Sequence, residues 1–129
     1  MRKTILMMLL AVVSTSTLAA WVKVGEIGTT TDYADPTTIR KEGDNVKMWA
    51  LRDHKTKVLV ENGKPFKSTK EQSEYDCKEK QLRMLSMSFY SRNKARGEIV
   101  HRESDPGNWE PVEVGSTAEA LWKIACGKK

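Results

Sequence analysis

The first twenty residues constrain the fold more than any other part of the sequence, because they predict that the chain folds outside the cytoplasm. Arg2 and Lys3 are followed by an apolar run of ten residues, TILMMLLAVV, and then by small residues that end at Ala19 and Ala20. This order is typical of a secretory signal peptide, and the run is too short to cross the hydrocarbon core of a bilayer. We expect cleavage after Ala19, so that residues 1–19 are the signal. Cleavage after Ala20 and an uncleaved N-terminal anchor are the alternatives.

Cleavage leaves residues 20–129 as the mature chain. Its length, 129 less 19 or 110 residues, suits one domain with one hydrophobic core. Removal of Arg2 and Lys3 leaves 20 of the 22 lysines and arginines against 17 acidic residues, a mildly basic balance of +3. The basic residues are spread along the chain without interleaved aromatic residues. We therefore expect no nucleic-acid partner and, after cleavage, no membrane span.

Two cysteines, Cys77 and Cys126, are the only ones in the chain. An even number of cysteines in a small exported domain predicts a disulfide, because the compartment is oxidising. A zinc site would need two more ligands, and the two histidines, His54 and His101, lack the short spacing of such sites. A catalytic thiol would need a nearby histidine and would be oxidised quickly. We expect a Cys77–Cys126 disulfide, no metal site and no cofactor.

Alternating and β-branched patterns predict two hairpins. VKMWALR, residues 46–52, is expected to be a strand that pairs with YADPTTI across a turn at KEGDN. QLRMLSMSFYS alternates, and RNKAR is expected to turn it back into EIVHRE. Residues 70–83 have a helical composition but few apolar residues at helical spacing, so we interpret them as a strand with Tyr75 and Cys77 on one face. The longest predicted loop is ENGKPFKSTK, residues 61–70.

The C-terminal segment carries the signals of both helix ends. Ser116 and Glu119 form a capping box, and Gly127 is a stop signal. The apolar residues between them recur at i, i+3, i+4 and i+7, and they are Ala118, Leu121, Trp122 and Ala125. Cys126 lies on the last turn, so a bridge to Cys77 would hold the helix on the sheet. The predicted fold class is α+β, a single antiparallel sheet of about six strands with a C-terminal helix packed on it and one disulfide.

Several motifs follow one another in an order that is informative as a set. AAWVKVGE is followed by DPTTIRKEGDNVKMWAL, YDC, RMLSMSFY, GEIV and NWEPVEVGSTAEALWKIAC. This order, and within it Cys77, Trp109, Pro111, Ser116 and Cys126, resembles the bacterial surface-adhesin protein E family over about residues 20–126. The resemblance implies an antiparallel sheet, a C-terminal helix and a disulfide, in agreement with the prediction from the residues. It also implies export and, for some members, binding of host extracellular-matrix and serum proteins.

Two short segments carry most of the candidate binding residues. They are SRNKAR, with Arg92, Lys94 and Arg96, and RDHKTK, with Arg52, His54, Lys55 and Lys57. We interpret the chain as an exported, non-enzymatic, adhesin-like binding module. These charged loops and one sheet face would recognise an acidic host extracellular protein or an envelope protein. The competing interpretation is that the charges belong to solvated turns that keep the protein soluble.

A small periplasmic enzyme and an envelope structural protein without an adhesive role are the alternative functions. Carboxylates are plentiful, but an acid and base pair is defined by its spatial arrangement, and no Gly-x-Ser-x-Gly, His-Glu-x-x-His or phosphate-binding glycine loop is present. We therefore assign no catalytic residue. The signal predicts export without choosing between periplasm and cell surface. Both a monomer and a dimer formed through an edge strand are compatible with the sequence.

Overall fold

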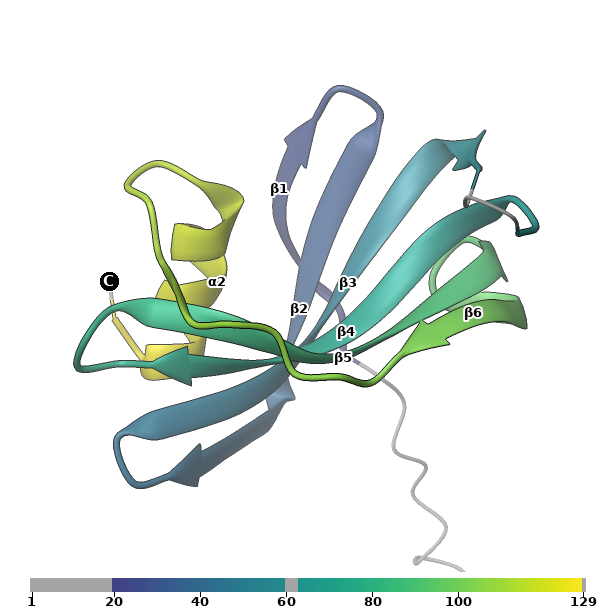
Figure 1. The fold of residues 1–129 in the computed structure, drawn as a ribbon. Coiled ribbons are helices and arrows are strands. Elements are labelled where there is room, and N and C mark those ends of the chain that lie inside the picture. Colours follow the sequence, from purple (N-terminus) through teal and green to yellow (C-terminus); the bar gives the residue numbers. More distant parts are fainter. Residues whose placement is uncertain (1–19, 60–62, 129) are drawn as a thin grey trace, which may run out of the picture.

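A curved antiparallel sheet and one helix make up the part of the chain that the computed structural model describes, residues 20–59 and 63–128 (Figure 1). The strands are β1 (Val22–Ile27), β2 (Thr30–Glu42), β3 (Asn45–Val58), β4 (Phe66–Asp76), β5 (Gln81–Arg92), β6 (Arg96–Glu103) and β7 (Glu110–Pro111), and the helix is α2 (Thr117–Cys126). The sheet order is β1-β2-β3-β4-β5-β6, and β7 pairs with β5. The predicted α+β fold is confirmed. The predicted signal, residues 1–19, lies outside the described residues.

Both predicted hairpins are confirmed. The β2–β3 turn has two central residues, Gly43 and Asp44, between the paired Glu42 and Asn45. Gly43 has a φ of 66°, and a glycine at the first central position is typical of a tight hairpin turn. β3 continues to Val58, six residues beyond its predicted end, because its pairing with β2 extends to His54 and its pairing with β4 resumes at Val58 after a register shift.

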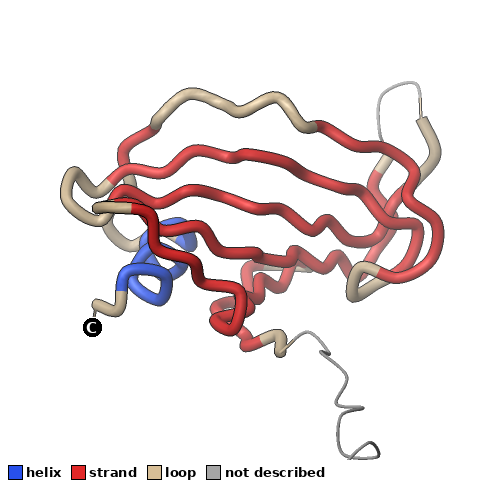
Figure 2. The backbone as a smooth tube through the Cα atoms, turned by 90° about the horizontal axis from the view of Figure 1, so that it is seen from below, coloured by secondary structure: helices blue, strands red, loops and turns tan. Residues whose placement is uncertain are grey.

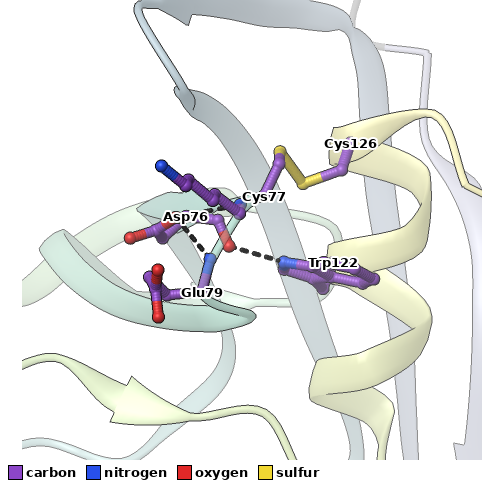
Figure 3. Close-up of a disulfide and its surroundings, with 6 residues drawn as sticks. Asp76, Cys77, Glu79, Trp122 and Cys126 are labelled. Atoms are coloured by element: carbon purple, nitrogen blue, oxygen red, sulfur yellow. Dashed lines mark hydrogen bonds between the residues drawn. A yellow bond between two sulfur atoms is a disulfide. The ribbon is translucent and has the colours of Figure 1, made fainter.

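The segment before β5 differs in two ways from the sequence prediction. Residues 66–70, predicted as loop, begin β4, and their alternate side chains Phe66 and Ser68 are buried. Residues 70–76 are strand as predicted, but residues 77–80 form a turn, so Cys77 does not lie on a strand face with Tyr75. Asp76 causes this turn, because its Oδ1 accepts the backbone N–H groups of Lys78 at 3.0 Å and Glu79 at 2.9 Å (Figure 3).

The helix has the predicted ends. Ser116 is the N-cap, and its Oγ accepts the N–H of Glu119 at 3.1 Å. In a capping box the side chain at N3 also binds the backbone N–H of the N-cap. Here Glu119 Oε1 instead accepts the N–H of Gly115, the residue before the N-cap, at 3.0 Å. Gly127 ends the helix in the left-handed conformation, with φ 69°. No helix in the described ranges is long and apolar enough to span a membrane.

The helix packs on one face of the sheet, near one end of it (Figure 2). The shared core has side chains from the helix, from three central strands and from the segment before the helix: Trp122, Ala125, Ala34, Val46, Met48, Tyr75 and Val112. Burial of this apolar surface is the main force that holds helix and sheet together. The opposite end of the sheet, where the β5–β6 turn lies, is left uncovered by the helix (Figure 1).

Candidate binding surface

The two cysteines form the predicted disulfide, and it joins the helix to the β4–β5 turn. Cys77 and Cys126 are bonded, with their Cα atoms 5.7 Å apart. One helical turn before Cys126, the indole Nε1 of Trp122 donates to the backbone oxygen of Asp76 at 2.9 Å (Figure 3). The described residues contain no free cysteine. Cys77 is therefore half of a structural disulfide, and the charged residues around it do not surround a reactive thiol.

At the other end of the sheet, the β5–β6 turn is bound to β3. The amide Nδ2 of Asn93 donates to the backbone oxygen of His54 at 2.9 Å and to Asp53 Oδ1 at 3.2 Å. The backbone N–H of Lys94 donates to the same Oδ1 at 2.8 Å. These bonds bring together the two predicted basic segments, which are about forty residues apart in the chain.

A second anchor lies beneath the turn on β4. The side chain of Ser68 is fully buried, and its Oγ donates to the backbone oxygen of Arg92 at 2.6 Å while accepting the N–H of Ala95 at 2.9 Å. Gly97 completes the turn with a φ of 83°, and a Cβ at this position would collide with the side chains of Ser91 and Arg92. The backbone of the turn is therefore held in one conformation.

We define the basic rim as Arg92, Lys94 and Arg96, the three cations that this turn presents. Arg92 and Arg96 face each other in the strand register and are exposed. The Nζ of Lys94 lies 4.0 Å from the centroid of the Tyr33 ring, a cation–π contact. Within residues 20–59 and 63–128, none of the three forms an ion pair.

The other predicted binding residues lie on different faces of the sheet. Lys55 and Lys57 are exposed on the outer part of β3, and Lys55 Nζ lies 3.5 Å from Glu26 Oε2. Arg52 is held elsewhere, because its Nε bonds Asp32 Oδ1 at 2.7 Å. The register pairs Arg52 with Asp32 and the adjacent Leu51 with Tyr33, so Arg52 points to the face opposite the one that Lys94 covers. The structure does not bring Arg52 to the basic rim.

A hollow of about 400 Å³ lies at the base of the turn and includes a histidine and a carboxylate. Its lining residues are Thr31, Tyr33, Asp53, His54, Lys55 and Asn93. Burial lowers the pKa of His54 and the positive charge of Arg52 lowers it further, while Asp32 and Asp53 oppose this in part, so the neutral ring is favoured at pH 7. The His54 ring packs edge-on against Phe66, and Asp53 accepts the two bonds that fix the turn. His54 and Asp53 therefore both make contacts that stabilise the fold.

The second histidine lies two aromatic rings away from the first. Phe66 packs against Phe89 at 4.9 Å between centroids, and Phe89 packs against His101 at 5.2 Å. His101 also lies 3.4 Å from Glu103, on the exposed strand β6. No cluster of three metal-ligating side chains occurs in the described part of the chain. His54 and His101 are thus separate elements of an aromatic row rather than parts of one site.

Sequence reasoning did not identify the residues that build this surface. Asp53, Ser68 and Asn93 each look like ordinary polar residues of a strand or turn, and their partners are 24 to 41 positions away in the chain. The sequence also does not show that burial raises the pKa of Glu71, one of its many carboxylates. No local signal distinguishes such residues, since their role depends on pairing between strands that are distant in sequence.

Comparison with known proteins places these observations in a family. The model of the family described as Surface-adhesin protein E matches residues 21–127. Crystal form II of Haemophilus influenzae protein E has a TM-score of 0.68 at 13% identity, over 88% of this chain and 91% of that chain. A crystal structure of protein E from non-typeable Haemophilus influenzae has a TM-score of 0.57 at 14% identity, over 88% and 79%. At these identities the structural likeness establishes the fold. No curated protein matches the sequence significantly.

Proposed function

Because this chain belongs to the surface-adhesin protein E family, we propose that it is an exported, adhesin-like binding module that recognises a protein partner through the basic rim. The observation that carries the proposal is the pair of anchors beneath the β5–β6 turn. Asp53 and Ser68 bind the turn backbone from two strands, while Arg92, Lys94 and Arg96 stay without ion pairs among the described residues. A turn held in one conformation loses little conformational entropy when a partner binds.

The charge of the rim indicates the chemistry of the partner. Three cations that form no ion pair among the described residues favour a surface rich in Asp and Glu, and such complementarity speeds association and orients the encounter. Lys57 extends the positive surface along β3, and Lys55 does so beside Glu26, whereas His54, with its lowered pKa, adds little charge at neutral pH. Display at the cell surface would make the partner a host extracellular protein, and retention in the periplasm would make it an envelope protein.

Charge reversal tests the rim. Cross-linking and mass spectrometry on intact cells identify the partner, and its affinity is then measured with purified proteins. We expect the triple variant Arg92→Glu, Arg96→Glu and Lys94→Glu to weaken binding by between about threefold and about a hundredfold, since each lost charge contact at a rim contributes about 0.2–1 kcal/mol. Binding by the unchanged protein should also weaken as salt is raised.

The matched control reverses three exposed lysines, namely Lys41, Lys78 and Lys128. They form no ion pair in the described part of the chain, and they lie beside the β2–β3 turn, in the β4–β5 turn and directly after the helix cap. Both triple variants change the net charge by the same amount. Equal binding by the rim variant and the control variant would remove the rim from the proposal. The alternatives, an enzyme or a structural envelope protein, predict that result.

A further inference from the structure

A buried carboxylate in the middle of the sheet receives a hydrogen bond from the first described residue of the chain. Asp35 is 3% exposed and pairs with Trp49 in the register between β2 and β3. Its Oδ1 accepts the backbone N–H of Thr37 at 3.0 Å and also the hydroxyl of Thr37. Its Oδ2 accepts a bond from the backbone nitrogen of Ala20 at 3.2 Å.

The structure fixes Asp35 in this position through an irregular part of β2. The register shifts between Asp35 and Arg40, after Pro36, which has no N–H to donate. The Oγ1 of Thr38 replaces a ladder bond, because it donates to the backbone oxygen of Asp35 at 2.6 Å and accepts the N–H of Trp49 at 3.0 Å. Asp35 cannot turn to solvent without breaking these contacts.

Among the described residues, no Lys, Arg or His forms an ion pair with Asp35. Its donors are an amide, a hydroxyl and the nitrogen of Ala20. A buried carboxylate without a counter-charge is costly, and proteins usually pair such groups.

We propose that cleavage of the Ala19–Ala20 bond supplies this counter-charge. Hydrolysis by a signal peptidase adds one water molecule across the bond, so that Ala19 leaves with a carboxylate and the nitrogen of Ala20 becomes a terminal amine. With an ordinary pKa of about 7.7–8.0, that amine is mostly protonated at neutral pH. In the uncleaved chain the same nitrogen is an uncharged amide. The ion pair with Asp35 Oδ2 therefore forms only in the mature protein.

The same geometry distinguishes the two cleavage positions that the sequence allows. Cleavage after Ala19 places the ammonium on the atom that lies 3.2 Å from Asp35 Oδ2. Cleavage after Ala20 removes that atom and places the charge on Trp21, whose Cα is about 3.8 Å further along the chain. Because β1 begins at Val22, the ion pair would also fix the start of this edge strand.

Export of the full chain with its own signal tests the cleavage position. Intact mass and N-terminal sequencing of the exported protein should show Ala20 as the first residue. A mature chain that begins at Trp21, or one that retains residues before Ala20, would overturn the proposal.

The charge is tested with residues 20–129, which contain every described strand and the helix. One protein begins at Ala20, and a second carries Gly-Ser before Ala20, so it keeps the N–H donor but moves the ammonium away. We expect the extension to lower the melting temperature by about 5 °C, on the order of what one partly buried ion pair contributes in a domain of this size. In the Asp35→Asn background the extension should have almost no effect.

An equal loss in both backgrounds would contradict the ion pair, as would no loss in either. If the Asp35→Asn protein does not fold, acetylation of the Ala20 amine provides the same comparison, because it removes the charge and keeps the N–H. The acetylated protein should also melt about 5 °C lower, and an unchanged melting temperature would contradict the ion pair.

Discussion

At the scale of single residues, Glu71 shows how burial in a sheet changes an ordinary side chain. Burial raises the pKa of its carboxyl group, and a hydrogen bond from Ser73 Oγ at 3.2 Å and the charge of Arg52 oppose this only in part. The negative charge of Asp32 raises the pKa further. The folded protein therefore holds a proton on Glu71 more tightly than the unfolded chain does.

Glu71→Gln should change how stability depends on pH. Because the folded pKa is raised, the contribution of Glu71 to stability is fully present below the unfolded pKa and is lost as pH rises through the folded pKa. The Gln variant should lack this decline, so its advantage over the unchanged protein should grow from about pH 4 to neutral pH. Urea unfolding across this range measures the effect. Glu110→Gln, at an exposed position, is the control, and identical pH profiles for all three proteins would refute the prediction.

Gly97→Ala should destabilise the β5–β6 turn. Its φ of 83° is unfavourable for alanine, and the added Cβ would overlap the side chains of Ser91 and Arg92. We expect a loss of about 1–3 kcal/mol in the free energy of unfolding. Gly25→Ala is the matched control, because a Cβ there meets no atom within 4 Å. Equal losses in the free energy of unfolding for the two variants would contradict this prediction.

At the scale of elements, α2 depends on its attachments. A helix of ten residues is marginal in isolation, so the buried face with Trp122 and Ala125 has to be kept on the sheet. Three contacts converge there: the Cys77–Cys126 disulfide, the bond from Trp122 to Asp76, and the ion pair between Lys80 and Glu119 at 2.8 Å. All three involve residues 76–80, which include the turn that interrupts the long strand predicted from the sequence.

Removal of the disulfide should weaken the helix first. In the chain-entropy model, closing a loop with a sequence separation of 49 stabilises the fold by about 4 kcal/mol, and measured values of about 2–4 kcal/mol are typical. We expect the Cys77→Ser and Cys126→Ser double variant to lose about 2–4 kcal/mol in urea unfolding. Hydrogen exchange should accelerate in α2 before it does so in β3. Reduction of the unchanged protein should have the same effect, and equal exchange in both elements would contradict the proposed order.

At the scale of the whole molecule, the sheet separates the attachment of the helix from the proposed binding surface. One end carries the helix and the disulfide, and the other carries the basic rim (Figure 1). Distant sites in a protein usually contribute independently to stability and binding. This separation is the reason that the lysines near the helix end serve as controls for charge reversal at the rim. It also predicts that the double cysteine variant, where folded, keeps its affinity for the partner.

Local signals in the sequence determined the elements that depend on neighbouring residues. Ser116 and Gly127 mark the helix ends, Gly43 marks a tight turn, and two cysteines in an exported chain predict a disulfide. The helix ends and the tight turn depend on contacts within a few residues. The disulfide could be predicted because the sequence contains only two cysteines. The amino-acid sequence alone was therefore sufficient to predict the fold class.

Only the tertiary structure decided which distant groups meet. Strand pairing brings Asn93 to Asp53 and His54, turns Arg52 away from Lys94, and buries Ser68 beneath the turn. The same pairing places Asp35 against the nitrogen of Ala20. These contacts are set by register and by the face on which each side chain falls, and a shift of one residue would reverse them. Composition and spacing contain no record of register, so the sequence could name candidate charged residues but not show which of them lie together.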